Sequence, residues 1–327
     1  MTTPIAGPRR ILAVAGSGED QPALQCALRL AETHGASLEV IACVEQPHDL
    51  SILSRLSGTG TTALVADAVE RMRATLRERL ARLAPGRDIP LVVTVGKVYL
   101  EVIRHVAAAR CDFVVKAAEP LAGLERFLFS STDQHLLRKC PCPVWLLTPD
   151  APAAPKRIVA AVDLDIADAD EPETLASLNR AVIDTALLLV GAEKDAELTV
   201  LHAWDAIGEG MIWTHSAGDG ARVSAERYVN DVLDARQGAM RRFLLQTSER
   251  NGPGPRLVPK LARGTPEAVI HDHCRDRAAD LVVMGTVART GLGGVFIGNT
   301  AENIINRLEC SVLAVKPEGF ASPVLAR

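Results

Sequence analysis

A glycine-rich segment in the second half of the chain has the residue types of a phosphate-binding turn. It begins at Gly285, contains three further glycines between residues 291 and 294, and ends in Gly298-Asn299-Thr300. A backbone without side chains can approach a phosphate closely, and the amides at the start of a following helix supply donors and a favourable dipole. The segment therefore predicts a site for a phosphate-bearing ligand.

An ordinary capped helix start is the alternative explanation for the end of this segment. Asn299 and Glu302 have the capping-box spacing, with Asn299 at N-cap and Glu302 at N3, and Ser131 and Gln134 are their equivalents in the first half. Such a cap contributes about 1 kcal/mol and needs no ligand. The glycines, rather than Asn299, are what favours phosphate binding.

Two expected strands position these residues. The glycine-rich segment follows a buried strand at residues 281–284, and Asp163 follows another at residues 158–162. Strands alternate with amphipathic helices along the chain, which predicts right-handed crossovers and a doubly wound parallel sheet. Ligands bind such sheets beyond the carboxyl ends of the strands, where the strand order reverses. Asp163 and Gly285 are therefore expected at one edge of a sheet.

The chain contains an internal repeat. Residues 112–149 align without a gap on residues 280–317, with nine identities in 38 positions, and residues 10–15 align on residues 157–162. We predict two tandem doubly wound α/β domains, residues 1–150 and 151–327, each with a five-stranded parallel sheet flanked by helices. The expected strands are residues 11–15, 38–44, 91–95, 113–115 and 144–147, then 158–162, 198–203, 257–261, 281–284 and 312–315.

The composition agrees with this fold class and argues against a nucleic-acid partner or a membrane span. Of 327 residues 48% are hydrophobic and only 3% aromatic, as suits parallel strands covered by helices. The net charge of −4 lacks the basic excess that nucleic-acid binding favours. Apolar runs are far shorter than the ~20 residues of a membrane span, and the N-terminus has no signal-peptide core. We expect a cytoplasmic protein without a membrane span or nucleic-acid partner, whose seven cysteines are mostly reduced.

The repeat and the glycine-rich segment together resemble the tandem members of the universal stress protein family, and the resemblance covers the whole chain. Members that bind ATP carry a glycine, two residues, a glycine, nine residues, then glycine and Ser or Thr. Gly285 and Gly298 match, whereas Ala288 replaces the middle glycine and Asn299 the Ser or Thr. The resemblance implies an adenine nucleotide alpha hydrolase-like fold and an adenine nucleotide ligand, ATP with magnesium, in the second domain.

The resemblance also implies a role for each matching position. Asp163 would hold the ribose or adenine end of the nucleotide, and the backbone of Ala203 would meet the adenine. Met284 and Gly285 would lie under the ribose and phosphates. The triphosphate turn would be formed by Ala288, Arg289, Gly298, Asn299 and Thr300.

The first domain departs further from the nucleotide-binding pattern. Gly16 stands in place of Asp163, Ala117 in place of Gly285, and Ser130-Ser131 in place of Gly298-Asn299. The equivalent loop, residues 118–125, adds two carboxylates. We expect this site to bind nucleotide weakly or not at all. The resemblance further implies that the two domains pair through their fifth strands as an intrachain pseudo-dimer, and a homodimer of chains is a further hypothesis.

Three classes of function remain in view. The first is a non-enzymatic stress-response regulator or sensor that binds nucleotide. The second is a carrier or sensor of an apolar or lipid-like ligand, for which Trp204, Met211, Ile212 and Trp213 would form a wall. The third is a weak ATPase, although the chain has no phosphate-loop lysine motif for rapid hydrolysis. Residues 47–63 and 205–221 are expected to be long loops, the second a lid over the sheet edge.

Two clusters contain the donor types that zinc prefers. Cys140-Pro-Cys142 lies near His135, and His271, His273 and Cys274 lie close together in sequence. The cysteine pair precedes a buried strand, and residues 271 and 273 would point to different faces of one helix. We interpret these residues as buried thiols and surface histidines, and predict no metal site.

Overall fold

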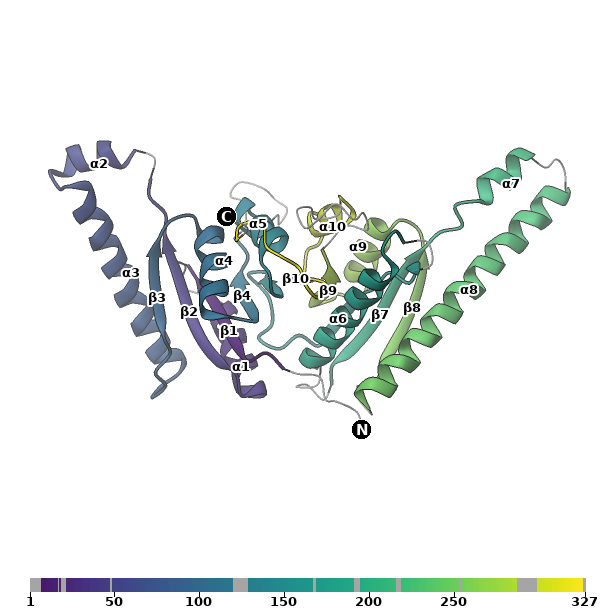
Figure 1. Ribbon diagram of the computed structural model, residues 1–327, viewed down its shortest axis with the longest axis horizontal. Helices are drawn as coiled ribbons and strands as arrows, with labels where there is room; N and C mark the ends of the chain where they lie inside the picture. The colour runs from purple at the N-terminus through teal and green to yellow at the C-terminus, as the bar shows by residue number, and fades with distance from the viewer. Residues whose placement is uncertain are drawn as a thin grey trace.

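The computed structural model describes residues 7–16, 18, 22–47, 49–119, 129–166, 169–190, 195–215, 219–252, 255–286 and 299–325. They form two α/β units, one after the other in the chain, whose outer ends diverge in a V shape (Figure 1). All ten expected strands are present, each within two residues of its predicted bounds. They are β1 (Arg10–Ala15), β2 (Ser37–Val44), β3 (Leu91–Val95), β4 (Phe113–Ala117), β5 (Val144–Leu147), β6 (Arg157–Ala161), β7 (Glu197–Trp204), β8 (Leu257–Arg263), β9 (Leu281–Gly285) and β10 (Ser311–Val315).

The strands form a single sheet in the order β3-β2-β1-β4-β5-β10-β9-β6-β7-β8. Pairing is parallel within each unit and antiparallel between β5 and β10, where Trp145 lies opposite Leu313. The expected pairing through the fifth strands is therefore confirmed. It makes the sheet mixed rather than purely parallel. β5 and β10 are buried along their whole length, because they are covered on both faces and lie in the middle of the sheet.

Helices cover both faces of the sheet. α1 shows why: Leu24, Ala27, Leu28 and Ala31 recur at helical spacing and are all buried, as predicted from their periodicity. One core contains residues of α1, α3 and α6, and the other contains residues of α4, α5, α9 and α10. The bounds are α1 (Pro22–His34), α3 (Thr61–Leu83), α4 (Val98–Ala109), α5 (Ser131–Lys139), α6 (Pro172–Val190), α8 (Asp219–Asn251), α9 (Pro266–Asp276) and α10 (Asn299–Ile305).

The expected loops after the second strand of each unit contain helices instead. α2 (Leu50–Ser57) packs on α3, and α7 (Glu209–His215) packs on α8, at the two outer ends of the molecule (Figure 1). α2 ends where Gly58 adopts φ 69°, a left-handed conformation that glycine takes without strain. Because α7 rests on α8, the prediction of a lid over the sheet edge was wrong. Among the described residues no helix has both the length and the apolar character of a bilayer span.

Side chains also join the two units. The ammonium of Lys316, directly after β10, donates to the backbone carbonyl of Leu137 on α5 and contacts the hydroxyl of Thr286. Glu302 of α10 forms an ion pair with Arg138 of α5. These contacts place the start of α10 and the end of β9 against the first unit.

The repeated aspartate at the start of the fourth strand has the same task in both units. The carboxylate of Asp280 accepts hydrogen bonds from the backbone N–H groups of Lys156 and Arg157, both at 2.9 Å. Asp112 accepts from the equivalent amides of Arg9 and Arg10. Each aspartate thereby fixes the start of the first strand beside the fourth, which explains why this residue is identical in the two copies.

Replacing Asp280 by Ala should destabilise the protein. The change removes two charge-assisted hydrogen bonds and the ion pair with Arg157, so the free energy of unfolding should fall by about 1.5–3 kcal/mol. Urea unfolding followed by circular dichroism measures this. Asp88→Ala, at an exposed position, should change stability by less than about 0.5 kcal/mol, and equal effects of the two substitutions would refute the role of Asp280.

Candidate functional site

The carboxyl edge of the second unit brings several predicted site residues together. β6 pairs with β7 on one side and β9 on the other, with Ala161 in register with both Leu201 and Met284. Asp163, two residues beyond Ala161, therefore lies between the ends of β7 and β9, which carry Ala203 and Gly285. This is the point where the strand order reverses, the usual ligand position in a doubly wound sheet.

The backbone of Asp163 is held by a buried asparagine. The backbone N–H of Asp163 donates to Oδ1 of Asn179 on α6 at 3.0 Å, and Nδ2 of Asn179 donates to the backbone carbonyl of Asp163 at 2.6 Å. One carboxylate oxygen of Asp163 accepts from the N–H of Asp165 at 3.2 Å. Asn179 was not predicted, although it interrupts the apolar face of α6 formed by Leu178 and Val182, and such a buried polar position is a usable signal.

An ionic cluster below Asp163 was also missed. Oδ1 of Asp165 lies 2.6 Å from Nε of Arg236 on α8 and 3.5 Å from Nε2 of His202 on β7. The other ring nitrogen of His202 lies 3.3 Å from the N–H of Leu164. His202 is almost completely buried, and its contacts with Leu164 and Asp165 support the edge of the sheet. The cluster anchors the long helix α8 to the loop that carries Asp163.

Gly285 lies in close contact with α6. A Cβ at this position would lie 2.4 Å from Cδ2 and 2.8 Å from Cγ of Leu178 on α6, closer than atoms can approach. Met284 is buried beside it. Glycine at position 285 therefore allows α6 to pack tightly on β9, and its contact with a nucleotide remains a prediction.

The remaining predicted residues are only partly described. Ala288, Arg289 and Gly298 lie outside the described residues. Asn299 is the first residue of α10 and so follows the N-cap position; Thr300 is exposed on the same helix. By these bounds the predicted N-cap residue, Asn299, already belongs to the helix, and the carboxylate of Glu302 forms an ion pair with Arg138 of α5.

The equivalent helix start in the first unit shows the correct register. Ser130, not Ser131, is the N-cap of α5, and Asp133 rather than Gln134 completes the capping box. The fully buried carboxylate of Asp133 accepts from the N–H groups of Ser130 and Glu119 and from Nζ of Lys116, at 3.2, 3.1 and 2.9 Å. An internal anion thus uses donors that a phosphate could otherwise use. The second unit has Met284 and Ala301 at the positions of Lys116 and Asp133.

Among the described residues, neither of the two clusters that contain zinc-type donors brings three ligand atoms within 4.8 Å of one another. Sγ of Cys140 and Sγ of Cys142 lie 3.7 Å apart in the core, and the ring of His135 packs at a tilt on Tyr99 with centroids 4.3 Å apart. His271 instead pairs with Asp272. The described cysteines are reduced, and burial raises the pKa of Cys26 to about 12, which keeps its thiol protonated at neutral pH.

Comparison with known proteins identifies relatives over nearly the full length. The model of the universal stress protein family matches residues 8–148 and again residues 155–316. Universal stress protein E of Salmonella typhi is 29% identical over 311 residues, covering 94% of this chain and 93% of the relative. Universal stress protein E of Escherichia coli K12 is 27% identical with the same coverage.

The fold has solved counterparts as well. A protein of unknown function from Pseudomonas aeruginosa PAO1 superposes with a TM-score of 0.63 at 23% identity, covering 96% of this chain and 94% of that one. A universal stress protein from Archaeoglobus fulgidus superposes with a TM-score of 0.56 at 16% identity, covering 94% and 98%. The two family matches within one α/β sheet lead to one conclusion: the chain belongs to the universal stress protein family.

Proposed function

We propose that the second unit binds ATP or a related adenine nucleotide, with magnesium, and that the protein acts in the cytoplasm as a stress-response regulator or sensor. The observation that carries the proposal is the position of Asp163, clamped by Asn179 at the strand-order reversal and close to the end of β9. Asn179 fixes the backbone of Asp163, and the carboxylate that this backbone carries can accept hydrogen bonds from ribose hydroxyl groups.

The residues around Asp163 fit such a ligand. Ala203, which is half-buried at the end of β7, adds only a methyl group beside a planar base, and buried Met284 supplies an apolar floor. Magnesium, when bound with the nucleotide, would neutralise part of the phosphate charge. The role of this chain's residues is to hold and orient the nucleotide.

The contrast between the two units supports one working site. In the first unit the Asp133 carboxylate accepts hydrogen bonds from the amides of Ser130 and Glu119. In the second unit Ala301 has no group that could compete with a phosphate in this way. We therefore propose a stoichiometry of one nucleotide per chain, with the first unit as a structural partner.

Isothermal titration of the full chain with ATP and magnesium tests this proposal. Asp163→Ala should weaken binding about 10- to 100-fold, because one hydrogen bond to a charged group contributes about 1.5–3 kcal/mol. Thr300→Ala should also weaken binding, whereas Thr132→Ala, its counterpart in the first unit, should not. No heat and no thermal shift at millimolar nucleotide would eliminate the proposal.

The same variants test whether any ATP hydrolysis comes from this chain. A weak ATPase predicts phosphate release that falls in Asp163→Ala and Thr300→Ala. Release that is unchanged in both would identify a contaminating enzyme as its source.

The exposed side chains around α7 favour a second candidate, binding of an apolar ligand. Ile207 is 89% exposed, Met211 67% and Trp213 49%, on the helical arm at the outer end of the second unit. Trp204, by contrast, is buried, so the four-residue wall expected from the sequence does not form as one surface. Mass spectrometry of gently extracted protein should detect such a ligand, and it should be lost in Trp213→Ser. Repeatedly clean extracts would count against this candidate.

A further inference from the structure

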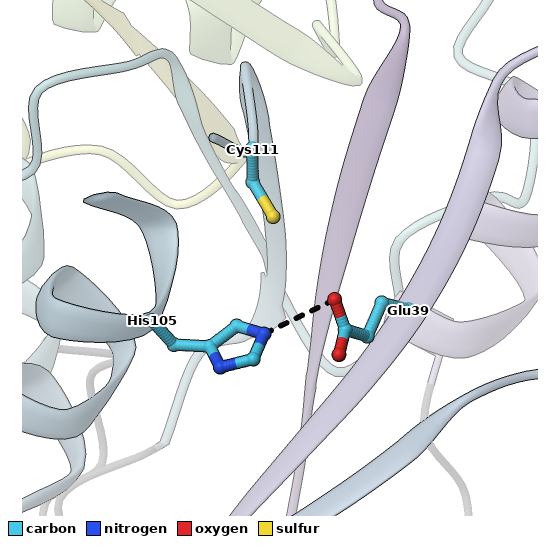
Figure 2. A group of neighbouring side chains, drawn as sticks. All are labelled: Glu39, His105 and Cys111. Atoms are coloured by element: carbon cyan, nitrogen blue, oxygen red, sulfur yellow. Dashed lines mark ion pairs between the residues drawn. The ribbon is translucent and has the colours of Figure 1, made fainter. Parts of the chain in front are cut away.

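Three side chains of different donor types meet in the first unit, away from the edge where we propose nucleotide binding. They are Glu39 on β2, His105 on α4 and Cys111 just before β4, and their ligand atoms all lie within 4.8 Å of one another (Figure 2). Glu39 is the third residue of its strand and Cys111 precedes its own. The cluster therefore lies at the amino ends of the parallel strands, opposite the carboxyl edge.

The spacing is close to what a metal ion requires. Nε2 of His105 lies 3.1 Å from a carboxylate oxygen of Glu39. Ligand atoms that surround zinc tetrahedrally are about 3.3–3.6 Å apart, given bonds of about 2.0–2.3 Å to oxygen, nitrogen and sulfur. Small side-chain rotations of Cys111 and Glu39 would complete the arrangement. Thiolate, imidazole and carboxylate together favour a borderline ion such as Zn²⁺ over Mg²⁺ or Ca²⁺.

The burial of the three groups agrees with a metal site. The side chains of His105 and Glu39 are 19% and 22% exposed, and Cys111 is 7% exposed. Nε2 of His105 is itself buried, and its contact with Glu39 is an ion pair whose geometry is not that of a hydrogen bond. A buried ring nitrogen that faces a carboxylate and a sulfur is arranged as a metal ligand would be.

The second unit provides an internal comparison. By repeat and strand register its counterparts of Glu39, His105 and Cys111 are Thr199, His273 and Ala279. These three residues line a cavity of about 220 Å³. Only the histidine is common to both units. The first unit thus has two additional donor groups at a place where the second has empty space.

We propose that Glu39, His105 and Cys111 bind one Zn²⁺ ion, with the fourth position open to water. The Cys111 thiol binds as the thiolate and releases its proton to solvent. The ion joins β2, α4 and the start of β4, and so stabilises the amino edge of the first unit. This site is independent of the proposed nucleotide function.

Cobalt is the probe for this site. The full chain, freed of metal with a chelator and kept reduced, should bind one equivalent of Co²⁺, with thiolate-to-cobalt absorption and the visible bands of tetrahedral coordination. Zn²⁺ should displace the cobalt and raise the melting temperature. Both signals should be lost in Cys111→Ala and Glu39→Thr, which introduce the residues of the second unit and so preserve the fold.

Matched variants distinguish this site from other thiols. His273→Ala, at the counterpart of His105, and Cys142→Ala should retain the cobalt spectrum. The double substitution Thr199→Glu with Ala279→Cys should create a second equivalent of bound metal around His273. Cobalt binding that persists in both Cys111→Ala and His105→Ala, or that is lost only in Cys142→Ala, would overturn the proposal, as would a wild-type chain that binds no cobalt.

Discussion

Asp133→Ala should lower the free energy of unfolding by about 3–5 kcal/mol, because it leaves the Lys116 ammonium buried without its principal partner. Nζ of Lys116 lies 2.9 Å from the Asp133 carboxylate, and the side chains are 4% and 0% exposed. Glu119 also contacts this ammonium, but it is 58% exposed and its attraction is therefore screened by water. The same substitution removes the acceptor for the Ser130 and Glu119 amides. Urea unfolding at pH 7 measures the loss.

The second unit indicates how to restore the lost stability. Lys116→Met alone should cost less than Asp133→Ala, because the carboxylate keeps three donors from Ser130 and Glu119. Lys116→Met combined with Asp133→Ala introduces the apolar pair found as Met284 and Ala301, and should recover most of the loss. Effects that simply add in the double variant would show that the ion pair contributes no coupling energy.

Stability should depend on Lys316 above neutral pH. Burial lowers the pKa of Lys316 from its ordinary 10.5 to about 7, although the nearby Cys140 opposes this. Between about pH 7 and 10.5 the unfolded chain binds this proton and the folded chain does not. Stability therefore rises with pH across this window, by about 1.4 kcal/mol per pH unit from this group alone.

Lys316→Met should remove that dependence. The difference in unfolding free energy between the wild type and Lys316→Met should change by about 2.3 kcal/mol from pH 7 to pH 9, in favour of the wild type at the higher pH. Taking the difference cancels other groups that titrate in the same range. Lys260→Met, at an exposed position, is the control and should show no such trend. A flat difference for Lys316→Met would mean that its ammonium keeps its proton in the folded chain.

Much of the fold could be predicted because burial on both faces leaves a simple trace in the sequence. The inner strands β1, β6 and β10 are nearly continuous runs of Val, Ile, Leu and Ala, and the repeat indicated the number and order of the strands. α2 was missed because its flanks contain Ser, Thr and Gly, which are typical of loops, and an eight-residue helix gives little periodic signal.

The details of the site were harder to predict, for two physical reasons. Two adjacent serines could each cap α5, and only the hydrogen bond that the Asp133 amide donates to Oγ of Ser130 decides between them. The partners of Asp165 come from β7 and α8, far away in the sequence, so their meeting depends on how α8 packs. Of these residues, only Asn179 could be recognised from its neighbours in the sequence, as a polar residue on the apolar face of α6.

The antiparallel junction of β5 and β10 has a consequence for how the two copies evolve and assemble. In a dimer of identical subunits every substitution appears on both sides of the interface, and dilution separates the halves. Here one covalent chain holds both halves at a high effective concentration, and Glu302 can meet Arg138 without a reciprocal pair being required. One copy is therefore free to lose a ligand site and keep its role as a permanent scaffold for the other.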